Sequence, residues 1–344
     1  MIANLQNTSH RRYNILTQEW VLVSPQRAKR PWQGQQEEIL NKKLNNYSSS
    51  CYLCAGNVRA GGKINPKYRD VFIFDNDFPA LQKNNSSFDI NDGLIKAQSE
   101  QGICKVICFS PNHSKSLADM TLTDIEKVVK AWQQQYNKQK SIRWINYVQI
   151  FENKGTVMGC SNPHPHGQIW SQQHLPNEII KKDYSQKKHY AKYNSSLLGA
   201  YLKQEINHKE RIVFKNKDFV VLVPFWAVWP YETMIIPKKQ QPSISKLNKE
   251  QRNSFAQAIS VVTKTYDKLF NCSFPYSSGI HQAPTTVNSH EHWHWHMSFY
   301  PPLLRSATVK KFMVGYEMFG MPQRDITAEM ATKALQKIIQ TPSL

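Results

Sequence analysis

Two histidines two residues apart are the strongest chemical feature of the sequence. They are His164 and His166, in the stretch Asn162–Trp170 that runs NPHPHGQIW. Successive side chains of a strand point to opposite faces, so both imidazoles should point the same way, with Pro165 facing the other. Proline also restricts such a strand to an edge or an irregular position of a sheet. The spacing predicts that two imidazole rings share one pocket.

The types of these residues favour chemistry on a phosphate. A neutral imidazole nitrogen can attack phosphorus and form a phosphoramidate, and His166 is the better candidate for this nucleophile. Gly167 behind it would let the chain approach a phosphate closely. Gln168, on the same strand face, can donate a hydrogen bond to a phosphoryl oxygen but cannot protonate a leaving group. The site therefore suits leaving groups with low pKa values, such as phosphates, and favours transfer over hydrolysis.

A second motif, Cys51-Tyr-Leu-Cys54, has the C-x₂-C spacing with which one tight turn offers two thiolates to a tetrahedral metal. The sequence has no second C-x₂-C pair, so the other ligands must come from elsewhere, with the candidates His113, His164 and His174. Thiolates combined with imidazoles favour zinc over iron or copper. Two buried or redox-active cysteines remain the alternative, although Ala55-Gly56-Asn57 favours a turn over the helix that follows thioredoxin-like motifs.

Composition and charge describe an ordinary globular chain with a basic surface. Of the 344 residues, 40% are hydrophobic, and 44 basic against 25 acidic residues give a net charge of +19. The lysines occur in scattered pairs such as Lys187-Lys188, which favours a solvated surface over a nucleic-acid groove. No run of 18 uncharged apolar residues predicts a membrane span. The N-terminal residues lack an apolar signal core and the six cysteines are too few for a disulfide framework, so we expect a cytoplasmic location.

The two halves of the chain carry the same order of elements. Each half has an apolar strand, a second apolar run ending in proline, a capped helix, another strand and a His-rich segment. In the first half these are Val71–Phe74, Ile103–Pro111, the helix after Thr123 and Glu126, Asn146–Phe151 and Asn162–Trp170; in the second they are Phe219–Val223, Thr233–Pro237, the helix after Asn248 and Gln251, Tyr276–Ile280 and His292–His296.

This order predicts a duplicated α+β unit, each copy a mostly antiparallel sheet with one crossing helix. The polar stretch Asn177–Asn194 is the expected linker, which places a domain boundary near residue 178. Gln33–Ser50 should form a surface loop and Ala328–Ile338 a closing amphipathic helix.

Four separated segments together resemble the galactose-1-phosphate uridylyltransferase family, a two-domain branch of the histidine-triad superfamily. They are Asn162–Trp170, Cys51 with Cys54, Phe109–Ser114 and Phe299–Thr308. The resemblance covers nearly the whole chain and implies two tandem histidine-triad-like domains, 1–178 with zinc and nucleophile and 179–344 with a hexose-contacting tail. It also implies a ping-pong reaction of galactose metabolism. UDP-glucose gives its uridylyl group to a histidine, glucose 1-phosphate leaves, and galactose 1-phosphate takes the group.

The resemblance assigns roles to residues of this sequence. His166 matches the nucleophile, Gln168 the donor to the transferred phosphoryl group, and Cys160 and Ser161 line the phosphates. The implied zinc ligands are Cys51, Cys54, His113 and His164. The implied nucleotide contacts are Arg27, Arg30, Asn76, Asp77, Phe78, Asn153 and Gly159. The implied hexose contacts are Lys311, Phe312, Val314, Tyr316, Glu317 and Gln323, which the neighbouring subunit of a homodimer would supply.

The sequence departs from the family at a second metal site, described for some members as iron and built from a carboxylate and three histidines. His281 and His296 match two of these histidines, but Ser298 stands at the position of the third. The segment Lys181-Lys182-Asp183 stands where the family has the carboxylate. His294 could substitute as a ligand because it lies on the strand face of His296. The alternative is an exposed polar stripe in which His292, His294 and His296 pack between Trp293 and Trp295.

Two other functions compete with the transferase. A nucleotide phosphorylase or a dinucleoside polyphosphate hydrolase would use the same nucleophile with phosphate or water as acceptor, and Gln168 counts against water. A zinc-stabilised nucleic-acid-binding protein is suggested by the charge of +19 and the nine tryptophans. Such a protein would have to bind single-stranded DNA or RNA at physiological ionic strength, with an affinity that depends on salt. We expect small-molecule substrates rather than nucleic acid or membrane partners.

Overall fold

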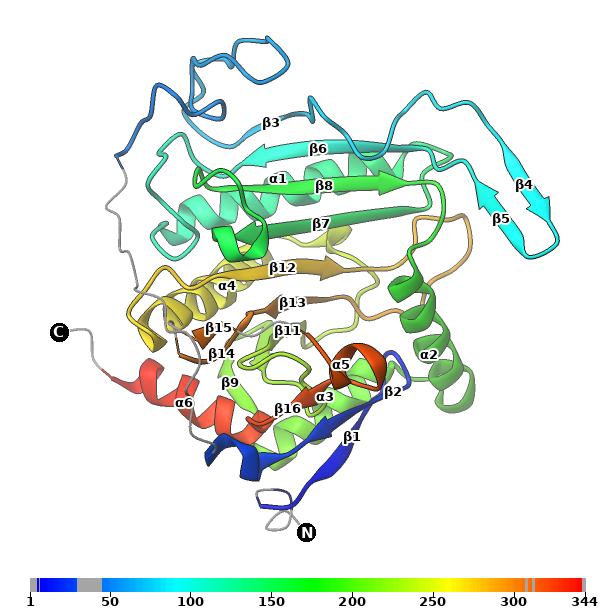
Figure 1. The fold of residues 1–344 in the computed structure, drawn as a ribbon, viewed down its shortest axis with the longest axis vertical. Helices are drawn as coiled ribbons and strands as arrows, with labels where there is room; N and C mark the ends of the chain where they lie inside the picture. The colour runs from blue at the N-terminus through cyan, green and yellow to red at the C-terminus, as the bar shows by residue number, and fades with distance from the viewer. Residues whose placement is uncertain (1–4, 6, 30–44, 307–308, 311–312, 342–344) are drawn as a thin grey trace.

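One nine-stranded sheet forms the body of the protein (Figure 1). The computed structural model describes residues 5, 7–29, 45–306, 309–310 and 313–341. Every neighbouring pair of strands in this sheet is antiparallel. The order is β3 (Phe72–Asp75), β6 (Gly102–Cys108), β8 (His166–Gln172), β7 (Tyr147–Lys154), β12 (Tyr276–His281), β13 (His296–Tyr300), β11 (Thr233–Pro237), β10 (Phe219–Leu222) and β9 (Ile212–Lys215).

The strand order repeats about the centre of the sheet, where β7 pairs with β12. From this pair outward, one half runs β7, β8, β6 and β3, and the other runs β12, β13, β11 and β10. Each half also has its crossing helix between its second and third strands along the chain. The predicted α+β class with antiparallel sheets is confirmed. Because the halves share one sheet, the division at residue 178 stays a prediction.

Two long helices cover one face of the sheet and form the main core with it. They are α1 (Leu122–Lys140) and α4 (Lys249–Leu269), which pack against each other. Apolar residues at helical spacing on both face the sheet, among them Val128, Trp132 and Ile259. The predicted capping box of Asn248 and Gln251 begins α4. The one predicted for α1 is wrong, because Thr121, two residues earlier than expected, caps that helix.

On the opposite face, the segment of Cys51 and Cys54 packs on β3 and β6 of the first half, and helices cover the second half. There, α2 (Asn177–Tyr193) and α3 (Leu197–His208) pack on residues that alternate with those facing α4. In β10, for example, Val221 contacts the α4 side whereas Val220 contacts the α3 side. The predicted linker 177–194 is therefore wrong as a linker, because it forms a helix with one buried side.

Smaller elements complete the structure. A three-stranded sheet of β1 (His10–Asn14), β2 (Glu19–Val23) and β16 (Gln323–Arg324) lies beside α3, and the hairpin β4 (Asp89–Asp92)–β5 (Ile95–Gln98) projects from the body (Figure 1). The remaining segments are β14 (Leu303–Ser306), β15 (Val309–Lys310), α5 (Tyr316–Phe319), the predicted α6 (Ala328–Gln340), and 3₁₀ turns at Pro25–Lys29, Thr156–Met158 and Ile244–Lys246.

Most of the expected loop 33–50 lies outside the described residues. None of the helices in the described part of the chain is both long and apolar enough to cross a membrane.

A buried ion-pair network joins the N-terminal strand to the last helix. Arg12 of β1 donates to both carboxylate oxygens of Glu329 in α6 at 3.0 and 2.9 Å. Arg211 donates to the same carboxylate at 2.8 Å and also pairs with Glu205 of α3. Burial alone would raise the pKa of Glu329, but the hydrogen bonds from the two arginines lower it to about 2.

We expect Glu329→Gln to lower the free energy of unfolding by about 3 kcal/mol at pH 7, because it breaks a buried ion pair and leaves two arginines incompletely paired. The folded-state pKa lies below the usual value of 4.5, so this stabilisation is present above pH 4.5 and is lost as pH falls toward 2. Urea unfolding of the wild type and of Glu329→Gln across this pH range should therefore give unfolding free energies that converge as the pH falls toward 2. Glu250→Gln, at an exposed pair with Lys217, is the control that should change little. A difference that stays constant down to pH 2 would contradict the prediction.

Candidate active site and metal centre

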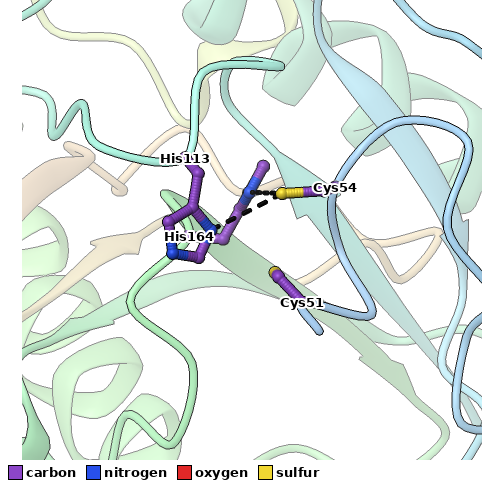
Figure 2. Close-up of side chains that lie close together, drawn as sticks. All are labelled: Cys51, Cys54, His113 and His164. Carbon is purple, nitrogen blue, oxygen red and sulfur yellow. Dashed lines mark hydrogen bonds between the residues drawn. The ribbon is translucent and has the colours of Figure 1, made fainter. Parts of the chain in front are cut away.

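Two cysteines and two histidines from three separate segments meet in a buried cluster (Figure 2). Cys51 and Cys54 lie in a turn closed by the bond from the Cys54 amide to the Cys51 carbonyl at 3.1 Å. His113 follows β6 and His164 precedes β8, so the ends of two adjacent strands deliver the rings. The ligand atoms of all four lie within 4.8 Å of one another. Spacing and resemblance together thus identified the complete set.

The cluster has the dimensions of a tetrahedral metal site. Nδ1 of His113 and Nδ1 of His164 each lie 3.6 Å from Sγ of Cys54. Bond lengths of about 2.3 Å to sulfur and 2.0 Å to nitrogen give a sulfur–nitrogen edge of about 3.5 Å in a tetrahedron. Burial lowers the pKa of His164 to about 4 and that of His113 below its usual value, which keeps the imidazoles neutral, as ligands must be. Burial also raises the pKa of Cys54 to about 11, the opposite of what a redox-active thiol needs.

A second layer of polar groups fixes the ligands. Nε2 of His164 lies 2.9 Å from the carbonyl of Ser110, so this nitrogen donates and Nδ1 keeps its lone pair for a metal. Tyr68 donates to the Leu53 carbonyl and lies 3.0 Å from Nε2 of His164. Asn162 accepts from the amide of His164 through its side-chain oxygen at 2.9 Å. His174, the other candidate ligand, lies elsewhere in an exposed ion pair with Glu100.

His166 is the first residue of β8 and faces a cavity of about 810 Å³ that is also lined by His164, Cys160 and Asn153. The predicted shared pocket of two imidazoles is therefore present, although the strand begins at His166 rather than at Asn162. Nδ1 of His166 donates to the carbonyl of His164 at 2.7 Å, which leaves the lone pair on Nε2. Burial lowers the pKa of His166, so the ring is neutral near pH 7.

Gln168 and Gly167 occupy different surroundings. The side-chain oxygen of Gln168 accepts from the indole of Trp170 at 2.9 Å, and this bond orients the amide so that its N–H groups remain as donors. Gly167 points to the packed side, where a Cβ would lie 2.8 Å from the Phe151 carbonyl and 2.9 Å from the ring of Phe109. Glycine is required there by strand packing, not by the approach of a phosphate as the sequence suggested.

The structure brings only some of the other implied phosphate and nucleotide residues to the cavity beside β8. Gly159, with a φ of 75°, ends the 3₁₀ turn before Cys160 and the exposed Ser161. Asn153 accepts from Ser277 at 2.7 Å and lines the cavity. The remaining members are Asn76, Asp77 and the exposed Phe78, which follow β3 two strands from β8, and Arg27, which pairs with Asp325 at 3.4 Å beside β2. Arg30 lies outside the described residues.

The implied hexose residues lie far from His166. Val314 and Tyr316 are exposed in and before α5, which Figure 1 shows beside β2 at the other end of the molecule. Glu317 pairs with Arg324 at 2.6 Å, and Gln323 donates to Asp325 at 2.7 Å. Among the described residues, none that lines the His166 cavity comes from this segment. Lys311 and Phe312 lie outside the described part of the chain.

Three histidines of the second half, His292, His294 and His296, are buried. His292 is hydrogen-bonded to Asp183 at 2.8 Å, and His294 and His296 are 0% exposed, so the predicted exposed stripe is wrong. Both ring nitrogens of His294 are engaged, with Ser196 at 2.9 Å and the Pro237 carbonyl at 2.7 Å. His294 therefore is not placed to replace the missing third ligand beside His281 and His296.

A charged network in the wall of the cavity was not predicted from the sequence. Tyr276 donates to Glu152 at 3.1 Å, and Lys154 pairs with Asp267 at 2.8 Å. Burial raises the pKa of Glu152 to about 7. Glu152 and Lys154 lie two residues apart on one face of β7, a spacing that is equally typical of a polar, half-exposed strand. Their burial results from the packing of β12 and α4 beside them.

The sequence matches two family models that together span almost its whole length. The first, described as galactose-1-phosphate uridyl transferase, N-terminal domain, covers residues 2–176, and the second, the C-terminal domain, covers residues 177–343. The chain belongs to the galactose-1-phosphate uridyl transferase family.

Other members of the galactose-1-phosphate uridyl transferase family are similar throughout. A galactose-1-phosphate uridylyltransferase of Haemophilus influenzae is 49% identical over 96% of this chain and 94% of its own length. The enzyme of that name from Saccharomyces cerevisiae is 46% identical with the same coverage. A solved uridylyltransferase structure matches with a TM-score of 0.77 and 25% identity over 97% of this chain and 99% of its own. An Arabidopsis thaliana ADP-glucose phosphorylase shares the fold, with a TM-score of 0.76 and 22% identity over 96% and 99% of the two chains.

Proposed function

We propose that this protein transfers the uridylyl group of UDP-glucose to galactose 1-phosphate through a covalent intermediate on His166. The observation that carries the proposal is the hydrogen bond from Nδ1 of His166 to the His164 carbonyl, which leaves Nε2 as a neutral nucleophile beside the cavity. The names of the relatives support the choice of substrates.

The chemistry follows from the arrangement of these groups. Nε2 of His166 bonds to the α-phosphorus of UDP-glucose while the bond to the departing glucose 1-phosphate oxygen breaks. That leaving group is a phosphate of low pKa and needs no proton, which suits the amide of Gln168, a donor that never titrates. In the second half-reaction a phosphate oxygen of galactose 1-phosphate attacks the same phosphorus and releases neutral His166. Cys160, Ser161, Asn153 and Gly159 would contact the phosphates and nucleotide, together with Asn76, Asp77 and Phe78. The resemblance adds Arg27 and Arg30, although Arg27 lies beside β2 with Asp325 and does not line the cavity of its own chain.

We assign zinc to the Cys51, Cys54, His113 and His164 cluster on the strength of its two thiolates, two imidazoles and tetrahedral spacing. His164 is both a ligand and the acceptor of the His166 hydrogen bond. Zinc would therefore hold the backbone that orients the nucleophile, without entering the chemistry.

We further propose a homodimer in which Val314, Tyr316, Glu317 and Gln323 of one subunit, with Lys311 and Phe312, complete the hexose pocket of the other. The distance of α5 from β8 within one chain supports this assignment (Figure 1). Met318 and Phe319 of α5 are 70% and 90% exposed, an apolar surface suited to an interface.

The test is incubation with UDP-glucose labelled in the uridylyl phosphate and without acceptor, followed by denaturation. We expect label on His166 that is labile in acid and stable in alkali, and that galactose 1-phosphate discharges as UDP-galactose. Discharge by inorganic phosphate or water instead would indicate the phosphorylase or hydrolase alternative. Absence of label from protein with a full metal site would refute the covalent mechanism.

A further inference from the structure

A cluster of buried polar atoms in the second half has no hydrogen-bond partners. His281 and His296 face each other on the paired strands β12 and β13, with ring centroids 4.8 Å apart and planes 24° from parallel. Ser298 lies two residues along β13 on the same face. Within the described structure, all four ring nitrogens of the two histidines and the Ser298 hydroxyl are buried without a partner. Unpartnered buried polar atoms cost free energy, so this cluster indicates that a polar group belongs among them.

The residues present do not fit a metal ion. In the described part of the chain, two groups of three or more potential ligands lie close together, and neither contains His281 or His296. The charged side chain that, after burial, contributes to lowering the pKa of both rings is instead a cation, Lys182 of α2, which is 5% exposed. A divalent ion held by two imidazoles next to an ammonium would meet repulsion with no carboxylate to offset it.

The ammonium itself has the properties that the cluster requires. It carries three N–H donors and no acceptor, and His281, His296 and Ser298 can offer one acceptor each. Burial lowers the pKa of Lys182 to about 8, and the carboxylates of Glu178 and Glu232 oppose this effect, so the ammonium is the main form at pH 7. Glu232 is buried and accepts from the amides of Val228 and Trp229, so it is fixed on this side of the cluster.

We propose that Lys182 takes the place of a second metal ion, with its ammonium as the cation of the His281–His296–Ser298 cluster at neutral pH. A side-chain rotation of Lys182 toward β12 and β13 would bring the ammonium into hydrogen-bonding distance. The His281–His296–Ser298 cluster then binds no metal ion, whatever reaction the chain catalyses.

The first test is metal content, measured by elemental analysis after equilibrium dialysis of the full-length protein against Zn²⁺ or Fe²⁺. We expect the wild type and His281→Ala to bind the same number of metal ions per chain. A second ion that His281→Ala removes would overturn the proposal. This comparison needs no variant at Lys182.

The second test converts the cluster into a metal site. Lys182→Glu replaces the internal cation by a carboxylate, and we expect it to bind one further metal ion that is lost again in Lys182→Glu/His281→Ala. With Co²⁺, the added site should show ligand-field bands without thiolate charge transfer, which distinguishes it from the Cys51–Cys54 site. Lys188→Glu, the same change at an exposed position of α2, should add no metal. A folded Lys182→Glu protein that binds no more metal ions than the wild type would contradict the proposed role of Lys182.

Discussion

Replacing His166 by glycine should lower the rate of uridylyl transfer by at least about 10⁴-fold, because removal of a covalent nucleophile abolishes both half-reactions. Metal content should not change, since the ring of His166 is not part of the cysteine–histidine cluster. The cavity should still bind nucleotide, so Kd for UDP-glucose should move much less than the rate. Stopped assays with labelled UDP-glucose, together with calorimetric binding, separate these two effects.

The control for this variant is His174→Gly, a change of the same kind at an exposed position that follows β8. It should retain both the labelled intermediate and turnover. If His166→Gly kept more than about a hundredth of the activity, His166 would be a binding residue, and another group would have to carry the uridylyl intermediate.

Cys54→Ser should have the largest effect on stability. Cys54 is completely buried, and its sulfur contacts the ligand nitrogens of both His113 and His164 at 3.6 Å. A serine hydroxyl is a poor zinc ligand, so the variant should lose its metal and about 4 kcal/mol of unfolding free energy. Activity should fall as well, because His164 would lose the ligand that fixes the backbone carbonyl bonded to His166. Elemental analysis, thermal unfolding and rate measurements on one preparation test all three effects.

Cys104→Ser is the matched control, since Cys104 is equally buried in β6 but lies outside the metal cluster. It should keep its metal. Chelation of the wild-type protein should reproduce the Cys54→Ser unfolding temperature. If metal-free wild-type protein unfolded at the same temperature as the loaded form, the cluster would not contribute to folding.

The features that local patterns encode could be predicted from the sequence. The repeated strands follow from runs of apolar residues, and the Asn248–Gln251 cap from a motif four residues long. The cysteine–histidine cluster could be predicted because Cys51 and Cys54 are neighbours in sequence, and because the resemblance selected His113 and His164 from the three candidate histidines.

Features that depend on partners distant in sequence were missed. The helix α2 carries many lysines, and its buried side includes Ile179 and the charged Lys182, so no apolar periodicity indicated it. The role of Gly167 depends on Phe109 and Phe151 in the adjoining segments. The burial of His292 and His294 depends on contacts with residues 183–237.

The repeat in the sheet gives His166 a counterpart. His166 begins β8 and His296 begins β13, so each is the first residue of the same strand in its half, and Gln168 corresponds to Ser298. The position of His166 opens onto a cavity, whereas the position of His296 is completely buried. The same strand position thus holds the proposed nucleophile in one half of the chain and a buried structural residue in the other. A duplicated chain of this kind should carry only one uridylyl group, however long it is exposed to substrate.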